Sequence, residues 1–247
     1  MIAKTIQQDL YGQSFEDVAI SRIREYEPPE GYYLAFSGGK DSIVIYDLAV
    51  RAGVKFDAHF TFTTLDPPEL LQFIKEHYTD VLWERPKTSM FKLIVKKGFP
   101  PTRTKRYCCG EIKEIHGKNR LVMTGLRKKE SVNRRNRRLY EQSTRNKKTW
   151  YLNPIIEWSD YDVWTYIRNH NLEYPCLYDE GYKRIGCILC PLQSIEGRKM
   201  DAERYPKYYK AFLRAFDRML KSRPDHSTFH SEWKTAEEVM DWWINTR

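Results

Sequence analysis

The stretch over residues 32–42, YYLAFSGGKDS, constrains this chain more than any other. Its apolar run at 33–36 is short enough for a buried strand, and Ser37-Gly38-Gly39 ends the run with residues that permit a tight turn. Residues 40–51 then carry apolar side chains at helical spacing. The sequence therefore predicts a strand, a glycine loop and a helix N-terminus in direct succession.

A loop of this kind favours an anion. Unpaired backbone N–H groups and the positive end of a helix dipole attract a phosphate group. The side chains of Ser37, Lys40 and Ser42 can add hydroxyl and ammonium donors. The glycine spacing differs from the G-x-x-x-x-G-K-[ST] loop and from the dinucleotide fingerprint. We expect a phosphate-binding loop of another kind; the alternative is that Gly38-Gly39 forms only a tight turn.

Strands and helical patterns alternate along the rest of the chain. After a first helix that starts near Ser14, we predict helices at 70–78 and 89–97 and further strands at 56–63, 80–84, 119–124 and 150–156. This alternation predicts an α/β fold with a Rossmann-like, mostly parallel five-stranded sheet covered by helices on both faces. Residues 1–157 are expected to form this core, and residues 158–247 a helical C-terminal region integrated with it as a single domain.

Ligands of such sheets collect at the carboxyl ends of the strands. The loops after Phe36, Thr63 and Thr124 are therefore expected to converge on one pocket.

The length of 247 residues suits one sizeable α/β core. The sequence has no apolar run of about 18 residues and no signal-peptide pattern at its N-terminus, so we expect a cytoplasmic protein with no membrane partner. Five cysteines, two of them adjacent, fit metal or redox chemistry better than a disulfide framework.

Positive charge is concentrated in residues 103–148. This region has sixteen Lys or Arg residues against four Glu residues, a balance of +12 in a chain whose formal net charge is +9. Such a region predicts a polyanionic partner, DNA or tRNA, or a highly charged nucleotide. A solvated surface is the alternative.

Four cysteines form a potential ligand set: Cys108, Cys109, Cys187 and Cys190. Four sulfur ligands suit tetrahedral zinc or an iron–sulfur cluster. Adjacent thiolates point in different directions. They can therefore bind different corners of a [4Fe–4S] cluster more easily than they can both bind a single metal ion. Zinc and unligated thiols remain as alternatives. Cys176 lies outside the set and is interpreted as a small apolar residue or as a reactive thiol.

Three motifs together resemble the phosphoadenylyl-sulfate (PAPS) and adenylyl-sulfate reductase family and its relatives, the ATP pyrophosphatases. Residues 37–42, SGGKDS, look like the SGGxDS pyrophosphate loop; residues 124–131 with Arg134 are similar to the TGxRxxES…R segment; and CC followed by CxxC resembles the [4Fe–4S] ligand set. The resemblance covers most of the chain. It implies that Arg127 and Arg134 face the sulfate or phosphate end of an adenine nucleotide.

The sequence departs from the reductases at one point. They carry a catalytic cysteine in a C-terminal ECGxH-type tail, and no cysteine follows Cys190 here. We therefore favour the ATP-pyrophosphatase branch, which includes a DNA phosphorothioation component and tRNA thiolation enzymes. The predicted function is an iron–sulfur ATP pyrophosphatase that activates an acceptor for sulfur transfer in nucleic-acid modification, with a sulfur-donor protein as a further partner. The alternatives are a sulfonucleotide reductase that uses Cys176 or a partner thiol, and a nucleotide-binding regulatory module without turnover.

Residue roles follow from this hypothesis. Lys40 and Arg127 would stabilise the charge of the departing pyrophosphate, and Asp41 or Asp66 would help to place Mg²⁺. Catalysis is thus assigned to Lys40, Asp41 and Arg127. The predicted nucleotide-binding residues are Ser37, Gly38, Gly39, Lys40, Asp41, Ser42, Thr63, Asp66, Gly125, Arg127 and Arg134. The cluster is expected to brace the fold or to hold activated sulfur, with the first role favoured.

Overall fold

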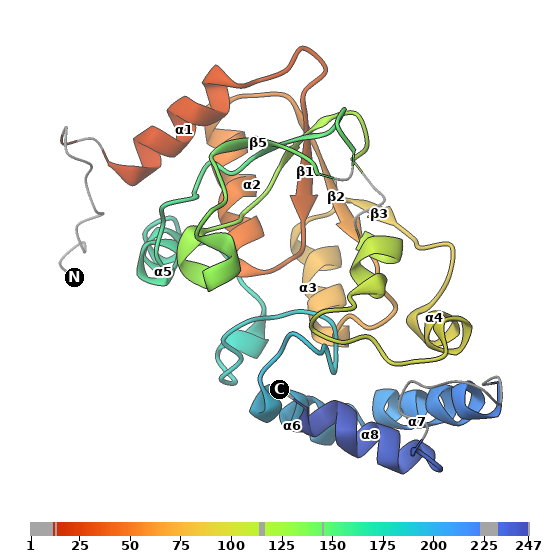
Figure 1. Cartoon of the computed structure of the whole chain (residues 1–247). Helices are drawn as coiled ribbons and strands as arrows, with labels where there is room; N and C mark the ends of the chain where they lie inside the picture. The colour runs from red at the N-terminus through yellow and green to blue at the C-terminus, as the bar shows by residue number, and fades with distance from the viewer. Residues whose placement is uncertain (1–11, 13, 114–116, 145, 223–231, 247) are drawn as a thin grey trace. The chain divides into compact units, whose positions relative to one another are not determined.

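The structure is a computed structural model that describes residues 12, 14–113, 117–144, 146–222 and 232–246. The chain forms two compact units (Figure 1). The first unit contains Met1–Thr61, Glu69–Glu84 and His116–Gly181. The second unit contains Phe62–Pro68, Arg85–Ile115 and Tyr182–Arg247.

A six-stranded sheet forms the centre of the first unit. Its spatial order is β3-β2-β1-β4-β6-β5. Neighbouring strands pair in parallel, except β5 and β6, which are antiparallel. The strands are β1 (Tyr32–Phe36), β2 (Phe56–Thr61), β3 (Leu82–Glu84), β4 (Leu121–Met123), β5 (Tyr140–Gln142) and β6 (Trp150–Leu152). This sheet confirms the predicted α/β class with a mostly parallel sheet.

The edge strand β5 corrects the predicted number of five strands to six. It has three residues and pairs with β6 in a register that sets Tyr140 opposite Leu152. The rings of Tyr140 and Trp150 stack across the pair, with their centroids 4.8 Å apart. The segment lies in the basic region and shows no run of alternating apolar residues, because an edge strand buries little of its surface. Sequence periodicity therefore could not reveal it.

Strand β1 occupies a central position because both of its faces bury apolar side chains. On one face Tyr32 and Leu34 are each 0% exposed, and on the other face Tyr33 is 6% exposed. The Tyr32 hydroxyl donates to the carbonyl of Ile23 at 2.8 Å, so the polar tip of this buried ring is satisfied. Burial on both sides holds the carboxyl end of β1, where the glycine loop begins, in place.

The helices of the first unit start and end where the sequence provides caps. They are α1 (Phe15–Glu25), α2 (Lys40–Ala52), α3 (Pro68–His77, from its second residue onward) and α5 (Asp160–Asn169). Ser14 caps α1 by accepting from the Asp17 N–H, and α2 ends at Gly53, which has a φ of +71°. Helix α2 packs against both α1 and α5. No helix in the described ranges is both long and apolar enough to cross a bilayer.

Helices dominate the second unit. They are α4 (Met90–Lys97), the π-helical turn η1 (Cys109–Lys113), α6 (Ile195–Arg204), α7 (Pro206–Lys221) and α8 (Ala236–Asn245). Helix α7 packs against α4 and α8 around buried rings, among them Phe212 and Trp243, whose centroids are 4.6 Å apart. Ile112 of η1 and the Ile188-Leu189 pair between Cys187 and Cys190 belong to the same core. Apolar packing therefore anchors both cysteine segments.

The two compact units divide the chain at other positions than residue 157, and the predicted boundary there stays a prediction. Residues 158–181, with α5, belong to the first unit, and Arg85–Ile115 belongs to the second. The reason is tertiary: α5 buries Val163 and Ile167 and packs on α2, although it follows the sheet in sequence.

Candidate functional site

The glycine loop is braced by its own serines. The Ser37 N–H donates to Ser42 Oγ at 3.1 Å, and the Ser42 hydroxyl donates to the Gly39 carbonyl at 2.8 Å. Gly39 is the N-cap of α2 and also accepts from the N–H groups of Ser42 and Ile43. Ser42 is 4% exposed. The loop therefore closes directly onto the helix N-terminus, which is the arrangement that binds anions.

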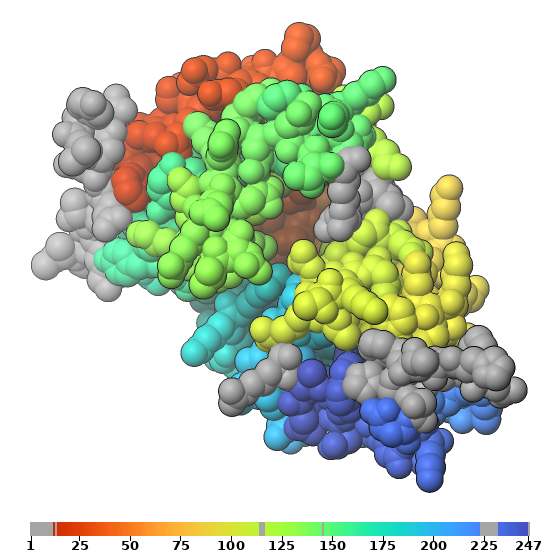
Figure 2. Space-filling view, in the orientation of Figure 1, coloured from red at the N-terminus to blue at the C-terminus, as the bar shows by residue number. Residues whose placement is uncertain are grey.

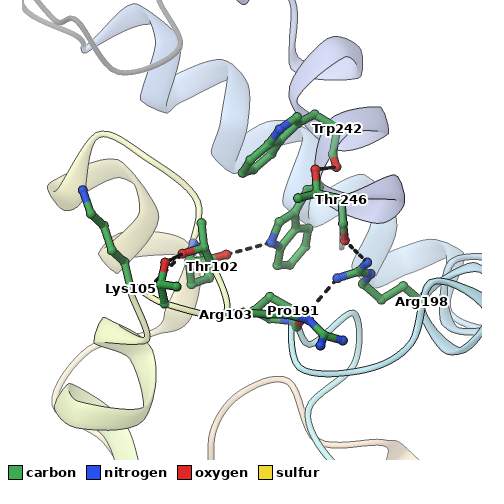
Figure 3. A pocket seen from close by; sticks show the side chains of 10 residues that line it. Thr102, Arg103, Lys105, Pro191, Arg198, Trp242 and Thr246 are labelled. Carbon is green, nitrogen blue, oxygen red and sulfur yellow. Dashed lines mark hydrogen bonds between the residues drawn. The ribbon is translucent and has the colours of Figure 1, made fainter.

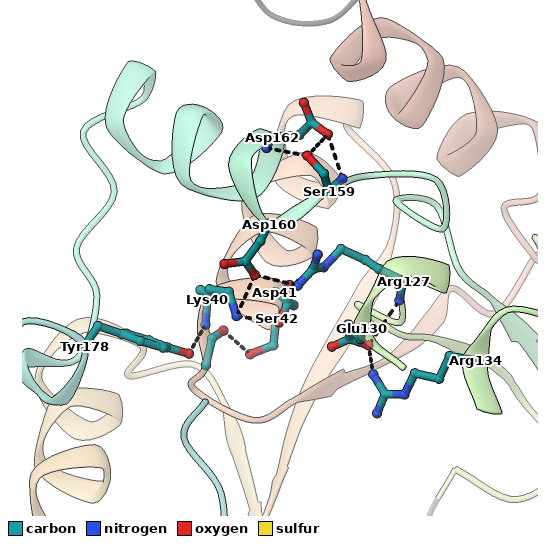
Figure 4. A network of polar contacts seen from close by, with 11 residues as sticks. Lys40, Asp41, Ser42, Arg127, Glu130, Arg134, Ser159, Asp160, Asp162 and Tyr178 are labelled. Carbon is teal, nitrogen blue, oxygen red and sulfur yellow. Dashed lines mark hydrogen bonds and ion pairs between the residues drawn. The ribbon is translucent and has the colours of Figure 1, made fainter. Parts of the chain in front are cut away.

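Two cations and two carboxylates meet at the start of α2 (Figure 4). Arg127 donates from Nε to Asp41 Oδ1 at 2.7 Å and from Nη2 to Asp160 Oδ1 at 3.0 Å. Lys40 Nζ lies 3.3 Å from Asp160 Oδ1 and 3.6 Å from Asp41 Oδ2. We call Lys40, Asp41, Arg127 and Asp160 the loop quartet.

Burial differs sharply within the loop quartet. The side chains of Lys40 and Arg127 are 6% and 3% exposed, whereas that of Asp160 is 64% exposed. Buried cations need a partner, because desolvation of an unpaired charge is costly. Asp160, which is exposed to solvent, forms ion pairs with both buried cations. It is therefore the member of the quartet that an incoming phosphate could replace at least cost.

Tyr178 covers the first amide of α2. The Lys40 N–H donates to the Tyr178 hydroxyl at 3.0 Å, and the Lys40 ammonium lies 5.6 Å from the centroid of the Tyr178 ring. Tyr178 closes the short 3-10 turn η4 (Cys176–Tyr178). Its hydroxyl sits where a phosphate oxygen would accept from this amide.

Gly125 allows the loop after β4 to approach α2. A Cβ added at this position would lie 2.7 Å from the backbone oxygen of Asp41, which is too close for a real side chain. The loops that follow Phe36 and Thr124 therefore meet, as predicted. The third loop, after Thr63, belongs to the second unit, and its convergence with the other two stays a prediction.

Gly38 is expected to be the least replaceable glycine of the loop. Its φ is +71°, and an added Cβ would lie 2.7 Å from the Cδ1 atoms of Leu70 and Ile74, both of which are buried. We expect Gly38→Ala to lower the free energy of unfolding by about 2–4 kcal/mol, since backbone strain and overpacking add. Gly53→Ala is the matched control: Gly53 has the same φ but nothing within 4 Å. Urea unfolding should show a loss of about 1 kcal/mol there, and equal losses would refute the packing argument.

The four thiols predicted as ligands act on one another within the second unit. A hydrogen bond between the side chains of Cys108 and Cys109 raises the pKa of Cys108 and lowers that of Cys109 to about 6. Burial raises the pKa of Cys190 to about 11, and the charge of Cys187 adds to this effect. Cys187 also raises the pKa of the Lys113 ammonium. The structure thus brings two distant cysteine pairs and one lysine into a common electrostatic environment.

The donor chemistry of this group fits a four-thiolate ligand set. Cys108, Cys109, Cys187 and Cys190 are all half-buried and in no disulfide. Among the described residues, no three or more His, Cys, Asp or Glu side chains are placed so that they could hold a metal ion. Sulfur alone as donor suits either an iron–sulfur cluster or zinc. The identity of the metal stays a prediction.

Two arginines of the second unit hold the turn that follows Cys190. Arg103 donates from Nε to the Pro191 carbonyl at 3.1 Å and from Nη2 to that of Gln193 at 2.9 Å. Arg198, 2% exposed, donates to the carbonyls of Pro191, Ile244 and Thr246. Both arginines line a cavity of about 260 Å³, together with Trp242 and Trp243 (Figure 3). Their contacts tie the cysteine turn to the chain segment before Cys108 and to the end of α8.

Two of the predicted nucleotide-binding residues, Thr63 and Asp66, belong to the second unit with the four thiols. The Thr63 N–H donates to Asp66 Oδ2 at 2.6 Å, and the Cys187 thiol donates to Thr63 Oγ1 at 3.5 Å. Burial raises the pKa of Asp66, against the effect of Lys113. A carboxyl group that resists ionisation is a poor Mg²⁺ ligand, which leaves Asp41 as the better candidate.

The remaining predicted residue, Arg134, pairs with Glu130 one turn earlier in the chain. No contact with Lys40 or Asp41 is found for Arg134 within the described residues. Sequence reasoning missed Asp160, at the start of α5, and Tyr178, at the end of η4, which contact Lys40 from far along the chain. The one available signal for Asp160 was the start of a helix at Ser159, which places this carboxylate in the first turn.

Comparison with known proteins identifies the family. The family model for the phosphoadenosine phosphosulfate reductase domain matches residues 31–193. The chain belongs to this family. The matched range begins just before β1 and ends after Cys190, so it includes the loop quartet and all four ligand cysteines.

Curated relatives agree with this assignment. An uncharacterized protein of Methanocaldococcus jannaschii is 31% identical over 72% of this chain and 39% of its own length. The adenosine 5'-phosphosulfate reductase of Staphylococcus haemolyticus is 28% identical over 70% of this chain and 76% of its own length. The chain spans less than half the length of the first relatives it matches.

Solved structures share the fold at low sequence identity. PAPS reductase from Candida auris, in a phosphate complex, has a TM-score of 0.53 at 19% identity, over 74% of this chain and 97% of that one. The FMN adenylyltransferase of Candida glabrata, in complex with FMN and the ATP analog AMPCPP, has a TM-score of 0.52 at 15% identity, over 70% and 61%. Structural neighbours of this fold therefore bind adenine nucleotides.

Proposed function

We propose that this PAPS reductase family protein is an ATP pyrophosphatase that activates a nucleic-acid acceptor for sulfur transfer. The observation that carries the proposal is the loop quartet at the N-terminus of α2. Two buried cations stand at a phosphate-binding loop, and two carboxylates stand beside them. A polyphosphate that arrives with Mg²⁺ needs both kinds of group.

The proposed reaction has two displacements. An acceptor oxygen forms a bond to the α-phosphorus of ATP while the bond from that phosphorus to the bridging oxygen breaks, and pyrophosphate leaves. A sulfur nucleophile from a donor protein then displaces AMP from the activated acceptor. Lys40 and Arg127 stabilise the charge that develops on pyrophosphate, because both are fixed in a desolvated place before the reaction starts.

Asp41 is the proposed residue for holding Mg²⁺, which would neutralise phosphate charge during the first displacement. Its carboxylate is 22% exposed and stands one residue from the loop amides. Arg127 holds it through Nε, so the orientation of the carboxylate depends on the loop after β4.

We propose a [4Fe–4S] cluster on Cys108, Cys109, Cys187 and Cys190, with zinc as the alternative. Such a cluster would brace the second unit or supply an iron site for activated sulfur. Support comes from the common core beneath both cysteine pairs and from the arginines that hold the turn after Cys190.

A specific observation favours a second function. Cys176 is exposed, forms no disulfide and lies on the same 3-10 turn as Tyr178, whose hydroxyl contacts Lys40 N–H. A thiol on this turn could attack the sulfur of a sulfonucleotide bound at the loop, as in a PAPS or adenylyl-sulfate reductase; the bond from that sulfur to the phosphate oxygen would break, the nucleotide would leave, and a thiosulfonate would form on Cys176. A thiol reductant would then have to release sulfite.

One assay separates the proposals. Anaerobically purified protein is incubated with ATP, with adenylyl sulfate and with PAPS, and both pyrophosphate and sulfite are measured. Pyrophosphate from ATP, increased by added DNA or tRNA, is the expected result. Thiol-dependent sulfite that disappears in Cys176→Ser would replace our proposal by the reductase. Nucleotide binding with neither product would indicate a regulatory module.

A further inference from the structure

The segment at 128–138 carries unusually dense positive charge. It has six Lys or Arg residues and a single carboxylate, Glu130. Two of the arginines are neutralised locally: Arg134 pairs with Glu130 and Arg137 pairs with Glu141, each four residues away. These pairs divide the segment into neutralised and unneutralised cations.

Four cations of this segment have no carboxylate partner among the described residues. They are Lys128, Lys129, Arg135 and Arg138. Lys128 is half-buried and the other three are exposed. Isolated surface cations are common, but four that remain unpaired beside two paired arginines leave a concentrated positive surface.

Three of the four unpaired cations line an open hollow. Lys128, Lys129 and Arg135 line a space of about 520 Å³, together with Ser131 and Val132. Val132 is 70% exposed. Figure 2 shows the green segment that contains these residues on the surface of the first unit. The hollow thus combines cations, a hydroxyl and an apolar side chain.

The hollow adjoins the loop quartet in the chain. Arg127 points to Asp41 and Asp160, while the next residue, Lys128, lines the hollow. The Lys128 N–H donates to the Ile156 carbonyl at 2.8 Å, which fixes the point where the chain passes from the quartet to the surface. The hollow therefore begins one residue away from the loop quartet along the chain.

We infer that the surface formed by Lys128, Lys129, Arg135 and Arg138 binds the phosphodiester backbone of the nucleic-acid acceptor; this inference rests on the proposed function. The unpaired cations contact phosphates, and the exposed Val132 contacts the sugar or base between them. Arg134 and Arg137 serve the fold and not the acceptor, because their charges are already satisfied.

The test compares two triple variants that remove the same number of charges. Lys128→Ala/Lys129→Ala/Arg135→Ala removes cations from the hollow. Lys118→Ala/Lys147→Ala/Lys148→Ala removes three exposed cations from the same basic region. Binding of a fluorescently labelled single strand of about 20 nucleotides is measured by anisotropy over a range of salt concentrations.

The hollow variant should bind about 10- to 100-fold more weakly at low salt, and its slope of log affinity against log salt should fall by about 2. The control variant should lose less than about threefold. Equal losses in both variants, or a wild-type protein that binds no nucleic acid, would overturn the inference.

Nucleotide affinity separates this inference from the proposed function. Calorimetry with ATP is run on the wild type and on both variants in the absence of nucleic acid. ATP binding without nucleic-acid binding refutes the docking surface and leaves the pyrophosphatase proposal. A wild type that binds the strand but not ATP refutes the pyrophosphatase proposal itself.

Discussion

Replacing Arg127 by alanine should lower the rate of pyrophosphate release from ATP by about 100- to 1,000-fold. Arg127 is a buried cation that bonds Asp41 and Asp160 at once, so it both positions the proposed Mg²⁺ ligand and offers charge to the leaving group. Among the described residues, its removal also leaves Asp41 and Asp160 with Lys40 as their one cationic partner. Turnover and ATP affinity are to be measured together with the circular dichroism spectrum, which reports whether the variant is folded.

Two further variants make this prediction sharp. Arg127→Lys keeps a positive charge but cannot reach both carboxylates through a planar fork, and we expect an intermediate loss. Arg137→Ala is the matched control from the same basic region, because Arg137 pairs with Glu141 and contacts no member of the loop quartet. Comparable losses in Arg127→Ala and Arg137→Ala would show that the arginine facing the loop has been misidentified.

Cys187→Ser and Cys109→Ser should each remove the metal from the protein. In the anaerobically purified wild type we expect about four iron and about four acid-labile sulfide per chain, and in either variant both should fall close to zero. The physical reason is that a cluster needs all four thiolates, and serine is a much weaker ligand for iron. The second unit should also melt at a lower temperature, since metal binding contributes to folding.

Cys176→Ser is the control for this experiment. Cys176 lies in the first unit, is exposed and is not in the ligand set, so its variant should keep a full complement of iron and sulfide. Equal metal loss from Cys176→Ser and Cys187→Ser would contradict the ligand assignment. Stoichiometric zinc in the wild type would replace the cluster by the alternative metal.

The local sequence was sufficient to predict the phosphate-binding loop at residues 37–42. The apolar run of β1, the turn at Ser37-Gly38-Gly39 and the helix that follows are neighbours in the chain, so their geometry depends on backbone preferences that can be read directly. The capping serine of α1 and the terminal glycine of α2 were readable for the same reason. The alternation of strands and helices was enough to predict the α/β class.

Contacts between residues that are far apart in the sequence could not be predicted from the sequence. Asp160 reaches Lys40 and Arg127 only because α5 packs on α2, and Tyr178 reaches the Lys40 amide across 138 residues of sequence. Thr63 and Asp66 follow the end of β2, yet the Thr63 hydroxyl accepts from the Cys187 thiol and the Asp66 carboxylate raises the pKa of Lys113. A sequence motif indicates which residue types belong to a site, but tertiary packing determines which residues contact one another there.

The amino-acid sequence by itself determined the phosphate loop, the alternating α/β pattern and the four thiols, because each depends on residues that are close together or chemically unmistakable. Only the tertiary structure decided which charges are neutralised. It paired Arg127 with two carboxylates, gave Arg134 and Arg137 local partners, and left Lys128, Lys129, Arg135 and Arg138 without partners in the described part of the chain. Electrostatic interactions act through space and depend on burial, so neither their partners nor their strength can be read from the order of residues.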